Sequence, residues 1–409
     1  MKLPFFKQMP AFKTADIHQT IERALSSAGL QTRSGPMLEV TDTIRRALAS
    51  AGLGTDPTPH PQDAAVIDVV ARVVDTPADA ARDAARPPQA LRPGQTEQTE
   101  QTGQFVTCMF SAAAGSRAYK LYVPDHAPAL PMPLIVMLHG CTQSADDFAA
   151  GTQMNRLAEE QGFIVVYPEQ PSSANLSKCW NWFSTQDQTR DGGEPALIAG
   201  ITREVMASQP VDPRRVFVAG LSAGAAMAVV MGETYPELYA GVGAHSGLPY
   251  GSAHDIPSAM AAMKGSRRPG HRPDMPHLAG GAAAARSRIK HAVPTIVFHG
   301  DRDHTVKQSN SQTIVEQACQ ARVADADKGA RSGLSKTVEQ GTSAAGRAFS
   351  RTVHTDAAGH AAIESWVLHG AGHAWSGGDA SGSYTDQAGP DASAEMVRFF
   401  LAQPPADSV

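Results

Sequence analysis

Cysteine is scarce in this chain, with four residues among 409, at positions 108, 141, 179 and 319. So few cysteines exclude a small disulfide scaffold, and their spacing matches no zinc-binding motif. No apolar run approaches the roughly 18 residues that a membrane span requires, so we expect no transmembrane helix. Charged residues are only 18% of the chain and the net charge is −5, so we expect no nucleic-acid partner. The hydrophobic content of 42% is ordinary for a globular protein.

The first ten residues contain two lysines but lack the apolar stretch of a secretory signal. We therefore expect a chain that stays inside the cell. Export by a non-classical or trimmed signal is the alternative.

Residues 1–75 contain an internal repeat. The segment 17–30, IHQTIERALSSAGL, recurs at 40–53 as VTDTIRRALASAGL, with apolar residues at the helical period and a glycine where helices often end. Such short helices are marginal alone, so their apolar faces must pack on each other, on the rest of the chain or on a hydrophobic particle. Residues 76–104, rich in Ala, Pro, Asp and Arg and then in polar residues, predict a disordered linker.

From residue 105 to about 405 the pattern predicts strands that alternate with helices. Continuous apolar runs, such as 134–138, are typical of buried parallel strands. Strands are expected at 117–123, 134–138, 163–167, 215–219, 239–244, 295–299 and 365–368, and helices at 146–161, 195–208, 223–234, 308–319 and 392–402. This order predicts a mostly parallel, doubly wound α/β sheet with helices on both faces.

The most informative motif follows the strand expected at 215–219. It reads Gly220-Leu-Ser222-Ala-Gly224, and an Ala, Met and Val run that predicts a helix comes next. Strand, G-x-S-x-G and helix together describe a nucleophile elbow, a tight turn that lifts a serine to the start of a helix. The sequence therefore predicts an α/β-hydrolase fold with Ser222 as the nucleophile.

Such a serine needs a general base and a carboxylate that orients the base, and the fold supplies them in the order Ser, Asp or Glu, His. Asp301 and Asp303 both follow the strand expected at 295–299. The usual spacing, His-Gly-x-x-Asp-x-x-Val, selects Asp303, and Asp301 is expected to shape the turn. His299, at the end of the strand, is expected to be structural.

The base is expected in the glycine-flanked loop after the last predicted strand. His369 still lies within that strand, so we expect it to be structural. His373 lies between glycines and is free to reach over the sheet. The predicted catalytic residues are therefore Ser222, Asp303 and His373.

An oxyanion needs two backbone N–H groups. One is expected from Ala223, directly after the nucleophile, and the other from Cys141, in the turn that His139 and Gly140 begin. Cys141 is also a candidate for a disulfide with Cys179, and two buried thiols are the alternative.

Five side chains are candidate substrate contacts. Burial in the core or a hydrogen-bonded structural role is the alternative for each aromatic ring and histidine. The five are His139, Trp180, Trp182, His245 and Trp375. No motif for a metal or cofactor is found, and the expected chemistry needs neither.

Two segments interrupt the alternation of strands and helices. Residues 250–290 are rich in Gly, Ala, Pro, Arg and His, and residues 321–349 are polar and small. The first follows the strand after the elbow, so it is a candidate lid or substrate rim. A surface insertion is the alternative.

With these residues placed, residues 105–402 resemble the poly(3-hydroxybutyrate) depolymerase family of esterases. The matching blocks are LHGCTQ at 138–143, GFIVVYPEQ at 162–170, CWNWF at 179–183, DPRRVFVAGLSAG at 212–224, GHAWSGG at 372–378 and SYTDQAGPDAS at 383–393. The resemblance implies an α/β-hydrolase that cleaves short-chain polyesters, with relatives that act on feruloyl and acetyl xylan esters. It implies the same three catalytic residues.

The resemblance also bears on location and partners. Many members of the family are secreted, whereas the missing signal and the missing polymer-binding module resemble the branch that acts on storage granules inside cells. A cytoplasmic or granule-associated location is therefore expected, with an extracellular one as the alternative. The repeats in residues 1–75 are candidates for the contact with a granule surface.

The predicted function is hydrolysis of the ester bonds of poly(3-hydroxybutyrate) or related short-chain polyesters and oligomers. The alternatives are a feruloyl or acetyl xylan esterase, a polyesterase of broad specificity and, in another class, a granule-binding protein with an inactive hydrolase fold. A peptidase is a further alternative, although nothing in the sequence marks a peptide-binding cleft.

Overall fold

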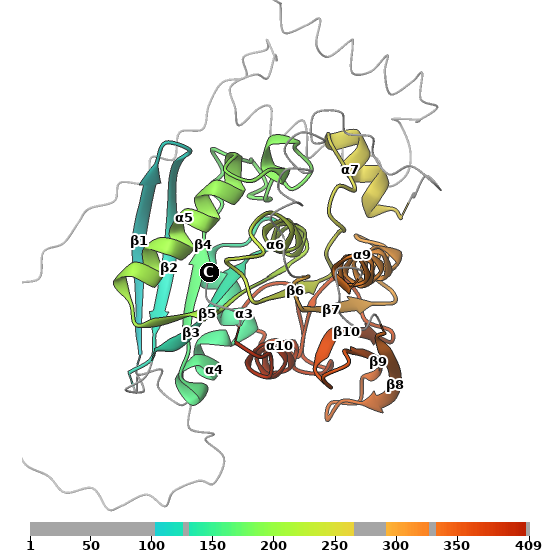
Figure 1. Cartoon of the computed structure of the whole chain (residues 1–409). Helices are drawn as coiled ribbons and strands as arrows, with labels where there is room; N and C mark the ends of the chain where they lie inside the picture. Colours follow the sequence, from blue (N-terminus) through green and yellow to red (C-terminus); the bar gives the residue numbers. More distant parts are fainter. Residues whose placement is uncertain (1–102, 126–130, 266–291, 327–332, 406–409) are drawn as a thin grey trace, which may run out of the picture. The chain divides into compact units, whose positions relative to one another are not determined.

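Ten strands form one sheet in the order β1-β2-β4-β3-β5-β6-β7-β10-β9-β8 (Figure 1). The structure, a computed structural model, describes residues 103–125, 131–265, 292–326 and 333–405. The strands are β1 (Gln104–Ala112), β2 (Gly115–Val123), β3 (Met132–Leu138), β4 (Ile164–Pro168), β5 (Val211–Leu221), β6 (Gly241–His245), β7 (Thr295–Gly300), β8 (Ser335–Thr342), β9 (Ala348–Thr355) and β10 (Ala361–Leu368). The six central strands, from β4 to β10 in this order, are parallel, and the two strands at each edge are antiparallel.

The predicted helical repeats in residues 1–75 lie outside the described residues. The same holds for the predicted linker at 76–104, except for its last two residues, and for residues 266–291 of the candidate lid. All described residues belong to one structural unit, Gly94–Val409.

Helices cover both faces of the sheet (Figure 1). One face packs against α5 (Gly193–Ser208), α6 (Ala223–Thr234), α7 (Ile256–Met263) and α9 (Ser309–Ala326). The other packs against α3 (Ala145–Thr152), α4 (Met154–Gln161) and α10 (Ala392–Leu401). A short 3₁₀ helix, η1 (Gln186–Gln188), precedes α5, and β11 (Trp375–Ser376) pairs with β12 (Thr385–Asp386) outside the main sheet.

Successive side chains of a strand point to opposite faces, and β5 shows why its sequence is apolar throughout. Val216 and Val218 lie in one hydrophobic cluster, whereas Phe217 and Ala219 lie in the other. All seven residues of β3 are buried as well. Burial of each large apolar side chain contributes about 2 kcal/mol, so the continuous apolar runs anchor the centre of the sheet.

The order of strands has a topological switch point at β3. β4 lies on one side of β3 and β5 lies on the other, so the chain reverses direction across the sheet at β3. The loops that leave the carboxyl ends of β3 and β5 therefore diverge, which is where ligands bind in open α/β sheets. These are the two loops in which the sequence predicts the oxyanion donor and the nucleophile.

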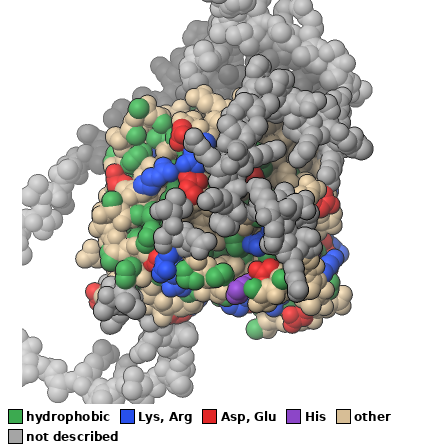
Figure 2. Space-filling model, in the orientation of Figure 1, with side chains coloured by type: hydrophobic (Ala, Val, Ile, Leu, Met, Phe, Trp, Pro, Cys, Tyr) green, Lys and Arg blue, Asp and Glu red, His purple; other side chains and the backbone are tan. Residues whose placement is uncertain are grey.

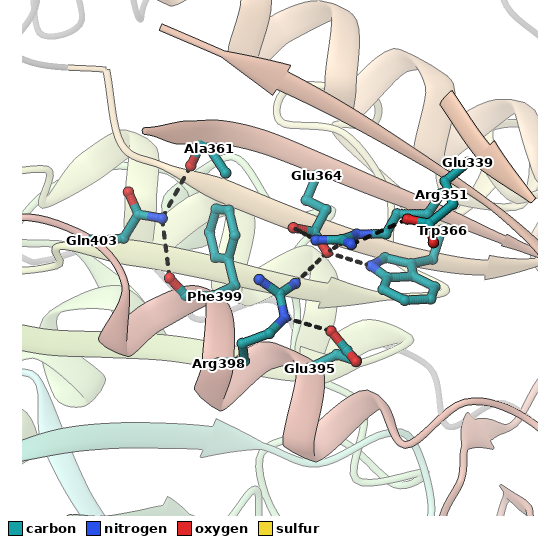
Figure 3. A network of polar contacts seen from close by, with 9 residues as sticks. All are labelled: Glu339, Arg351, Ala361, Glu364, Trp366, Glu395, Arg398, Phe399 and Gln403. Atoms are coloured by element: carbon teal, nitrogen blue, oxygen red, sulfur yellow. Dashed lines mark hydrogen bonds and ion pairs between the residues drawn. The ribbon is translucent and has the colours of Figure 1, made fainter. Parts of the chain in front are cut away.

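A buried carboxylate ties β9, β10 and α10 together (Figure 3). Glu364, on β10, is fully buried and accepts hydrogen bonds from Arg351 on β9, Arg398 on α10 and the indole N–H of Trp366. Three donors offset the cost of burying the charge. This contact fixes the last helix to the side of the sheet opposite α6.

The surface of the described part mixes charges of both signs. On the face drawn in Figure 2, acidic and basic side chains are interspersed with apolar and polar ones. The large hydrophobic side chains with the most exposed area are Val106, Met109, Leu176, Ile256, Met260, Val338 and Tyr384. None of the described helices is long and apolar enough to span a membrane.

The structure differs from the predicted elements in three places. The helix expected at 146–161 is two helices, because Gln153 adopts a left-handed backbone, φ 54°, that ends α3 and begins α4. The segment 321–349 is not without regular structure, since it contains β8 and the start of β9. No strand is predicted at 104–112, where β1 forms an antiparallel edge with β2.

Candidate active site

Ser222 stands between the end of β5 and the first residue of α6, with φ 57° and ψ −118°. A residue with a side chain rarely adopts this conformation, and it persists only where the surroundings impose it. The amide of Ser222 donates to the carbonyl of His245, 2.9 Å away at the end of β6, which holds the turn in place. Ser222 itself is partly exposed although the residues on both sides are buried.

The glycines of the motif are required because the turn presses against β3. A Cβ atom at Gly224 would overlap the carbonyl oxygen of Leu138, and one at Gly220 would overlap the backbone of Gly224. Only glycine lets the two backbones approach so closely. The contact also brings the end of β3, and the loop after it, beside the nucleophile.

Asp303 and His373 meet in the structure. The Nδ1 atom of His373 lies 2.6 Å from Oδ2 of Asp303, and Asp303 is buried whereas His373 is partly exposed. The other carboxylate oxygen, Oδ1, accepts the amides of Thr305 at 2.9 Å and Val306 at 2.8 Å. The carboxylate thus holds one nitrogen of the ring and leaves Nε2 free to act as a base.

The charge state of Asp303 follows from these contacts. Burial alone would raise the pKa of Asp303, but hydrogen bonds from His299, His373 and the Val306 amide hold this pKa well below its usual range. An ionised carboxylate accepts hydrogen bonds only, so it keeps the proton of His373 on Nδ1.

The loops that carry these three residues leave neighbouring parallel strands at the same edge of the sheet. Ser222 follows β5, Asp303 follows β7 and His373 follows β10, and the order across the sheet is β5-β6-β7-β10. The loops after β7 and β10 are joined by a hydrogen bond from the Arg302 amide to the Ala371 carbonyl, at 3.0 Å. The described residues include no hydrogen bond between the Ser222 hydroxyl and His373. Such a bond often forms only in the complex with substrate.

His245 lies behind this group, at the end of β6. Its ring is stacked between Phe298 and Trp375, and its Nε2 atom accepts the amide of Ser376 at 3.1 Å. Burial first, and then the neighbouring His299 and His373, lower the pKa of His245 to about 3. His245 is therefore a neutral support beneath the loop that carries His373.

The loop after β3 leaves one amide available. The Gly140 amide donates to Oε1 of Gln143 at 2.9 Å, and the Thr142 amide donates to the Ser177 carbonyl at 2.7 Å. Among the hydrogen bonds of the described residues, none uses the amide of Cys141 or that of Ala223. These two amides are the pair that the sequence predicts for the oxyanion hole.

Gln143 in turn is held by Asp147 and Ser383. Its Nε2 atom donates to Asp147 at 2.9 Å and to the Ser383 carbonyl at 3.1 Å. Burial opposes the charge of Asp147, but hydrogen bonds from Ser383 and Gln143 lower its pKa below the usual value. The sequence block LHGCTQ contains Gln143, but one of its partners, Ser383, lies 240 residues further along the chain.

The other side of the oxyanion loop is covalently fixed. Cys141 and Cys179 form a disulfide, with a distance of 2.02 Å between the sulfur atoms. The indole N–H of Trp180 donates to the carbonyl of His139 at 3.1 Å. His139 accepts the Gln170 amide on Nε2, so its proton lies on Nδ1, 2.7 Å from the Gly140 carbonyl. The segment 179–180 therefore braces this loop by a disulfide and a hydrogen bond.

A buried glutamate that sequence reasoning missed anchors that segment. Glu194, at the start of α5, accepts the amide and the side chain of Asn181, each at 2.7 Å, and the side chain of Gln170. Burial and the nearby Asp187 raise the pKa of Glu194, its hydrogen bonds oppose the rise, and the resulting pKa is about 7. No local pattern marks Glu194, because its partners come from two other loops.

The candidate substrate contacts need correction. His139, Trp180, His245 and Trp375 are at most 1% exposed, and their ring N–H groups or nitrogens pair with protein atoms. Such side chains cannot line an open pocket, so they support the loops of the site from behind. Trp182 is buried as well and packs edge-on against Phe183.

A second hydrogen-bonded Ser-His-Asp row lies on the surface. His369 Nε2 is 2.9 Å from the Ser350 hydroxyl and His369 Nδ1 is 3.0 Å from Asp301. Ser350, however, lies in the middle of β9, paired with β8 on one side and with β10 on the other. It lacks the adjacent free amides that acyl transfer needs, so this row is no second catalytic site.

Within the described ranges, no group of three or more His, Cys, Asp or Glu side chains is arranged to hold a metal ion.

Comparison with known proteins places the site in context. A family model described as "Esterase PHB depolymerase" matches residues 117–340. Poly(3-hydroxyalkanoate) depolymerase C of Paucimonas lemoignei is 35% identical over 267 residues, which are 64% of this chain and 60% of that protein. A probable acetylxylan esterase A of Aspergillus fumigatus is 32% identical over 223 residues, 52% of this chain and 57% of that protein. The matched regions thus span about three fifths of these relatives.

Among solved structures, an acetyl xylan esterase from Aspergillus awamori superposes with a TM-score of 0.55 and 23% identity, over 74% of this chain and 99% of that one. At this identity the likeness concerns the fold. It confirms the predicted α/β-hydrolase architecture.

Proposed function

Because the chain belongs to the esterase PHB depolymerase family, we propose that it is a serine esterase that hydrolyses poly(3-hydroxybutyrate) or related short-chain polyesters and oligomers. The observation that carries the proposal is the bond between His373 Nδ1 and the ionised Asp303, at 2.6 Å. It is supported by the strained position of Ser222 at the start of α6. The depolymerase relative from Paucimonas lemoignei supports the choice of substrate.

In the proposed mechanism, Nε2 of His373 takes the proton of the Ser222 hydroxyl, whose oxygen attacks the ester carbonyl. Asp303 stabilises the imidazolium that forms. The amides of Cys141 and Ala223 donate to the oxyanion of the tetrahedral intermediate. The imidazolium then gives its proton to the alcohol that leaves, and an acyl group stays on Ser222. Water, activated by the same ring, attacks the acyl group and releases the hydroxy acid.

The test combines labelling and turnover. The wild-type chain is expected to react with a fluorophosphonate at Ser222 and to hydrolyse hydroxybutyrate oligomers and p-nitrophenyl butyrate. Ser222→Ala is expected to lose the label and at least about three orders of magnitude in kcat. Undiminished hydrolysis by Ser222→Ala would refute the assignment. A wild-type chain that is folded but takes no label would favour a binding protein with an inactive fold.

A second candidate is an acetylxylan or feruloyl esterase. The acetylxylan esterase relatives favour it, since two of them are 31% and 32% identical to this chain over 223 residues. The catalytic residues would be the same, so only the substrate separates the two functions. A panel of amorphous and crystalline polyhydroxybutyrate, acetylated xylan and feruloyl esters decides between them: the higher kcat/KM identifies the class.

We also propose that the repeats in residues 1–75 contact the surface of a polymer granule. These repeats lie outside the described residues. The amphipathic pattern of the two repeats supports it. Cosedimentation of the full chain with granules is expected to weaken when residues 1–100 are deleted, whereas turnover of a soluble p-nitrophenyl ester is unchanged. Unchanged cosedimentation would contradict the granule contact without touching the esterase assignment.

A further inference from the structure

The carboxylate of Asp303 has a second histidine partner. Nε2 of His299, on β7, lies 3.3 Å from Oδ2 of Asp303, the same oxygen that His373 approaches at 2.6 Å. His299 is fully buried, and it is four residues before Asp303 in the motif His-Gly-x-x-Asp. Because His299 contacts the proposed catalytic pair, its role goes beyond filling the core.

The protonation of the ring decides the sign of this contact. Nε2 of His299 lies 2.8 Å from the carbonyl oxygen of Val306, which can only accept a hydrogen bond. Nε2 therefore carries a proton and donates it, shared between the Val306 carbonyl and the Asp303 carboxylate. Nδ1 of His299 is buried and has no partner among the described residues. The polar contacts of this ring are thus directed at the loop of Asp303.

The carboxylate has little freedom left. Oδ1 accepts the amides of Thr305 and Val306, and Oδ2 is shared by the two histidines. A donor on Oδ2 draws negative charge away from His373 and fixes the rotation of the carboxylate.

We infer that His299 is a positioning residue of the esterase, which orients the Asp303 carboxylate and limits how strongly this carboxylate stabilises the His373 cation. The inference rests on the proposed function, in which His373 must be neutral to accept the proton of Ser222. Without the N–H donor of His299, His373 would be the only hydrogen-bond donor to Oδ2 of Asp303. The cation of His373 would then be favoured to higher pH, and less of the enzyme would have a working base.

The other titratable or charged groups near Asp303 and His373 come from several elements. His245 approaches from the end of β6, His299 from β7 and His373 from the loop after β10. Arg302 and His304, on the loop of Asp303 itself, are exposed. Apart from His299 itself, none of these groups is replaced in an amide variant at position 299, so a shift in the pH profile reports the lost donor.

Two amide variants give a matched pair. In His299→Gln the amide nitrogen lies near the place of Nε2 and can still donate to Asp303 and Val306. In His299→Asn it lies near the place of Nδ1 and falls short of both. The readout is the rate constant of fluorophosphonate labelling at Ser222 between pH 5 and 9, which needs no ester substrate. The pH dependence of kcat/KM on p-nitrophenyl butyrate is measured beside it.

For His299→Asn we expect the acidic limb of both profiles to move up by about one pH unit, so that kcat/KM on this limb falls about tenfold. His299→Gln should stay close to the wild type. A His299→Asn profile that coincides with the wild-type profile would overturn the inference. So would equal shifts in the two variants, since equal shifts report loss of the ring and not of the donor.

His369→Gln is the control, because His369 also contacts an aspartate in the loop after β7 but lies on the surface. His369→Gln should leave the acidic limb of both pH profiles at its wild-type position. Thermal unfolding shows whether His299→Asn folds. If it does not, the test is the low-field proton NMR resonance of the His373 Nδ1–H group in His299→Gln. This resonance should keep its wild-type position, and its loss would overturn the inference. A wild-type chain that takes no label indicates failure of the proposed function instead.

Discussion

Cys179 is bonded through its sulfur to Cys141, the residue whose free amide is proposed to hold the oxyanion. The amide is therefore positioned from outside its own loop. Trp180, the next residue, donates to the carbonyl of His139 on the other side of the same turn. The segment 179–180 and the loop of the proposed oxyanion hole are therefore joined as one unit.

We predict that Cys179→Ser lowers kcat on p-nitrophenyl butyrate by about tenfold or more, with a smaller change in KM. An oxyanion donor acts mainly in the transition state, where a small displacement weakens its hydrogen bond. Steady-state kinetics of the purified variant measures the effect. Cys319→Ser, which changes a free thiol on α9, is the control and should keep wild-type kinetics. Full activity in Cys179→Ser would show that the bridge does not position the amide.

Gln143 restrains the same loop from the opposite side, since it joins the Gly140 amide to Asp147. We predict that Gln143→Leu lowers kcat by about tenfold, because the Gly140 amide is released and the loop loses its anchor. Gln312→Leu, at an exposed position of α9, should have no effect. An unchanged kcat in Gln143→Leu would mean that the disulfide alone fixes the loop.

The buried Glu194 predicts how the stability of the fold depends on pH. Its pKa of about 7 in the folded chain lies above the ordinary value of 4.5, so the folded state binds this proton more tightly than the unfolded state does. The stability that Glu194 contributes is full below about pH 4.5 and is lost as the pH rises to about 7, by about 3 kcal/mol at most.

In Glu194→Gln this part of the pH dependence should vanish. Urea unfolding at pH 5 and pH 8 measures it: the free energy of unfolding should fall less between the two pH values in the variant than in the wild type. Glu160→Gln, on the exposed end of α4, should keep the wild-type dependence. An equal decline in Glu194→Gln and the wild type would contradict the raised pKa.

Glu364 predicts the stability of the last helix. Glu364→Gln leaves Arg351 and Arg398 without their shared buried carboxylate, so we expect the free energy of unfolding to fall by about 3 kcal/mol. Glu395→Gln also removes a partner of Arg398, but at a more exposed position, and should cost less than about 1 kcal/mol. Similar losses in the two variants would show that burial of Glu364 adds nothing.

Several elements could be predicted from the sequence because a strong local signal marks them. The buried strands β3 and β5 are continuous apolar runs, and the glycines of the elbow follow from the close approach of its backbone to β3. The hairpin of β8 and β9 gives no such signal. All but one residue of β8 is exposed, so backbone pairing with β9 forms the strand and apolar periodicity does not.

By itself the sequence determined the central parallel strands, most of the helices between them and the motifs around Ser222, Asp303 and His373, since each of these depends on neighbours within a few residues. Only the tertiary structure decided which groups share a carboxylate or brace a loop, such as His299 at Asp303 and Glu194 at Asn181. The physical reason is that a buried polar group must find its partners in space. Those partners come from strands and loops whose distance along the chain leaves no pattern to read.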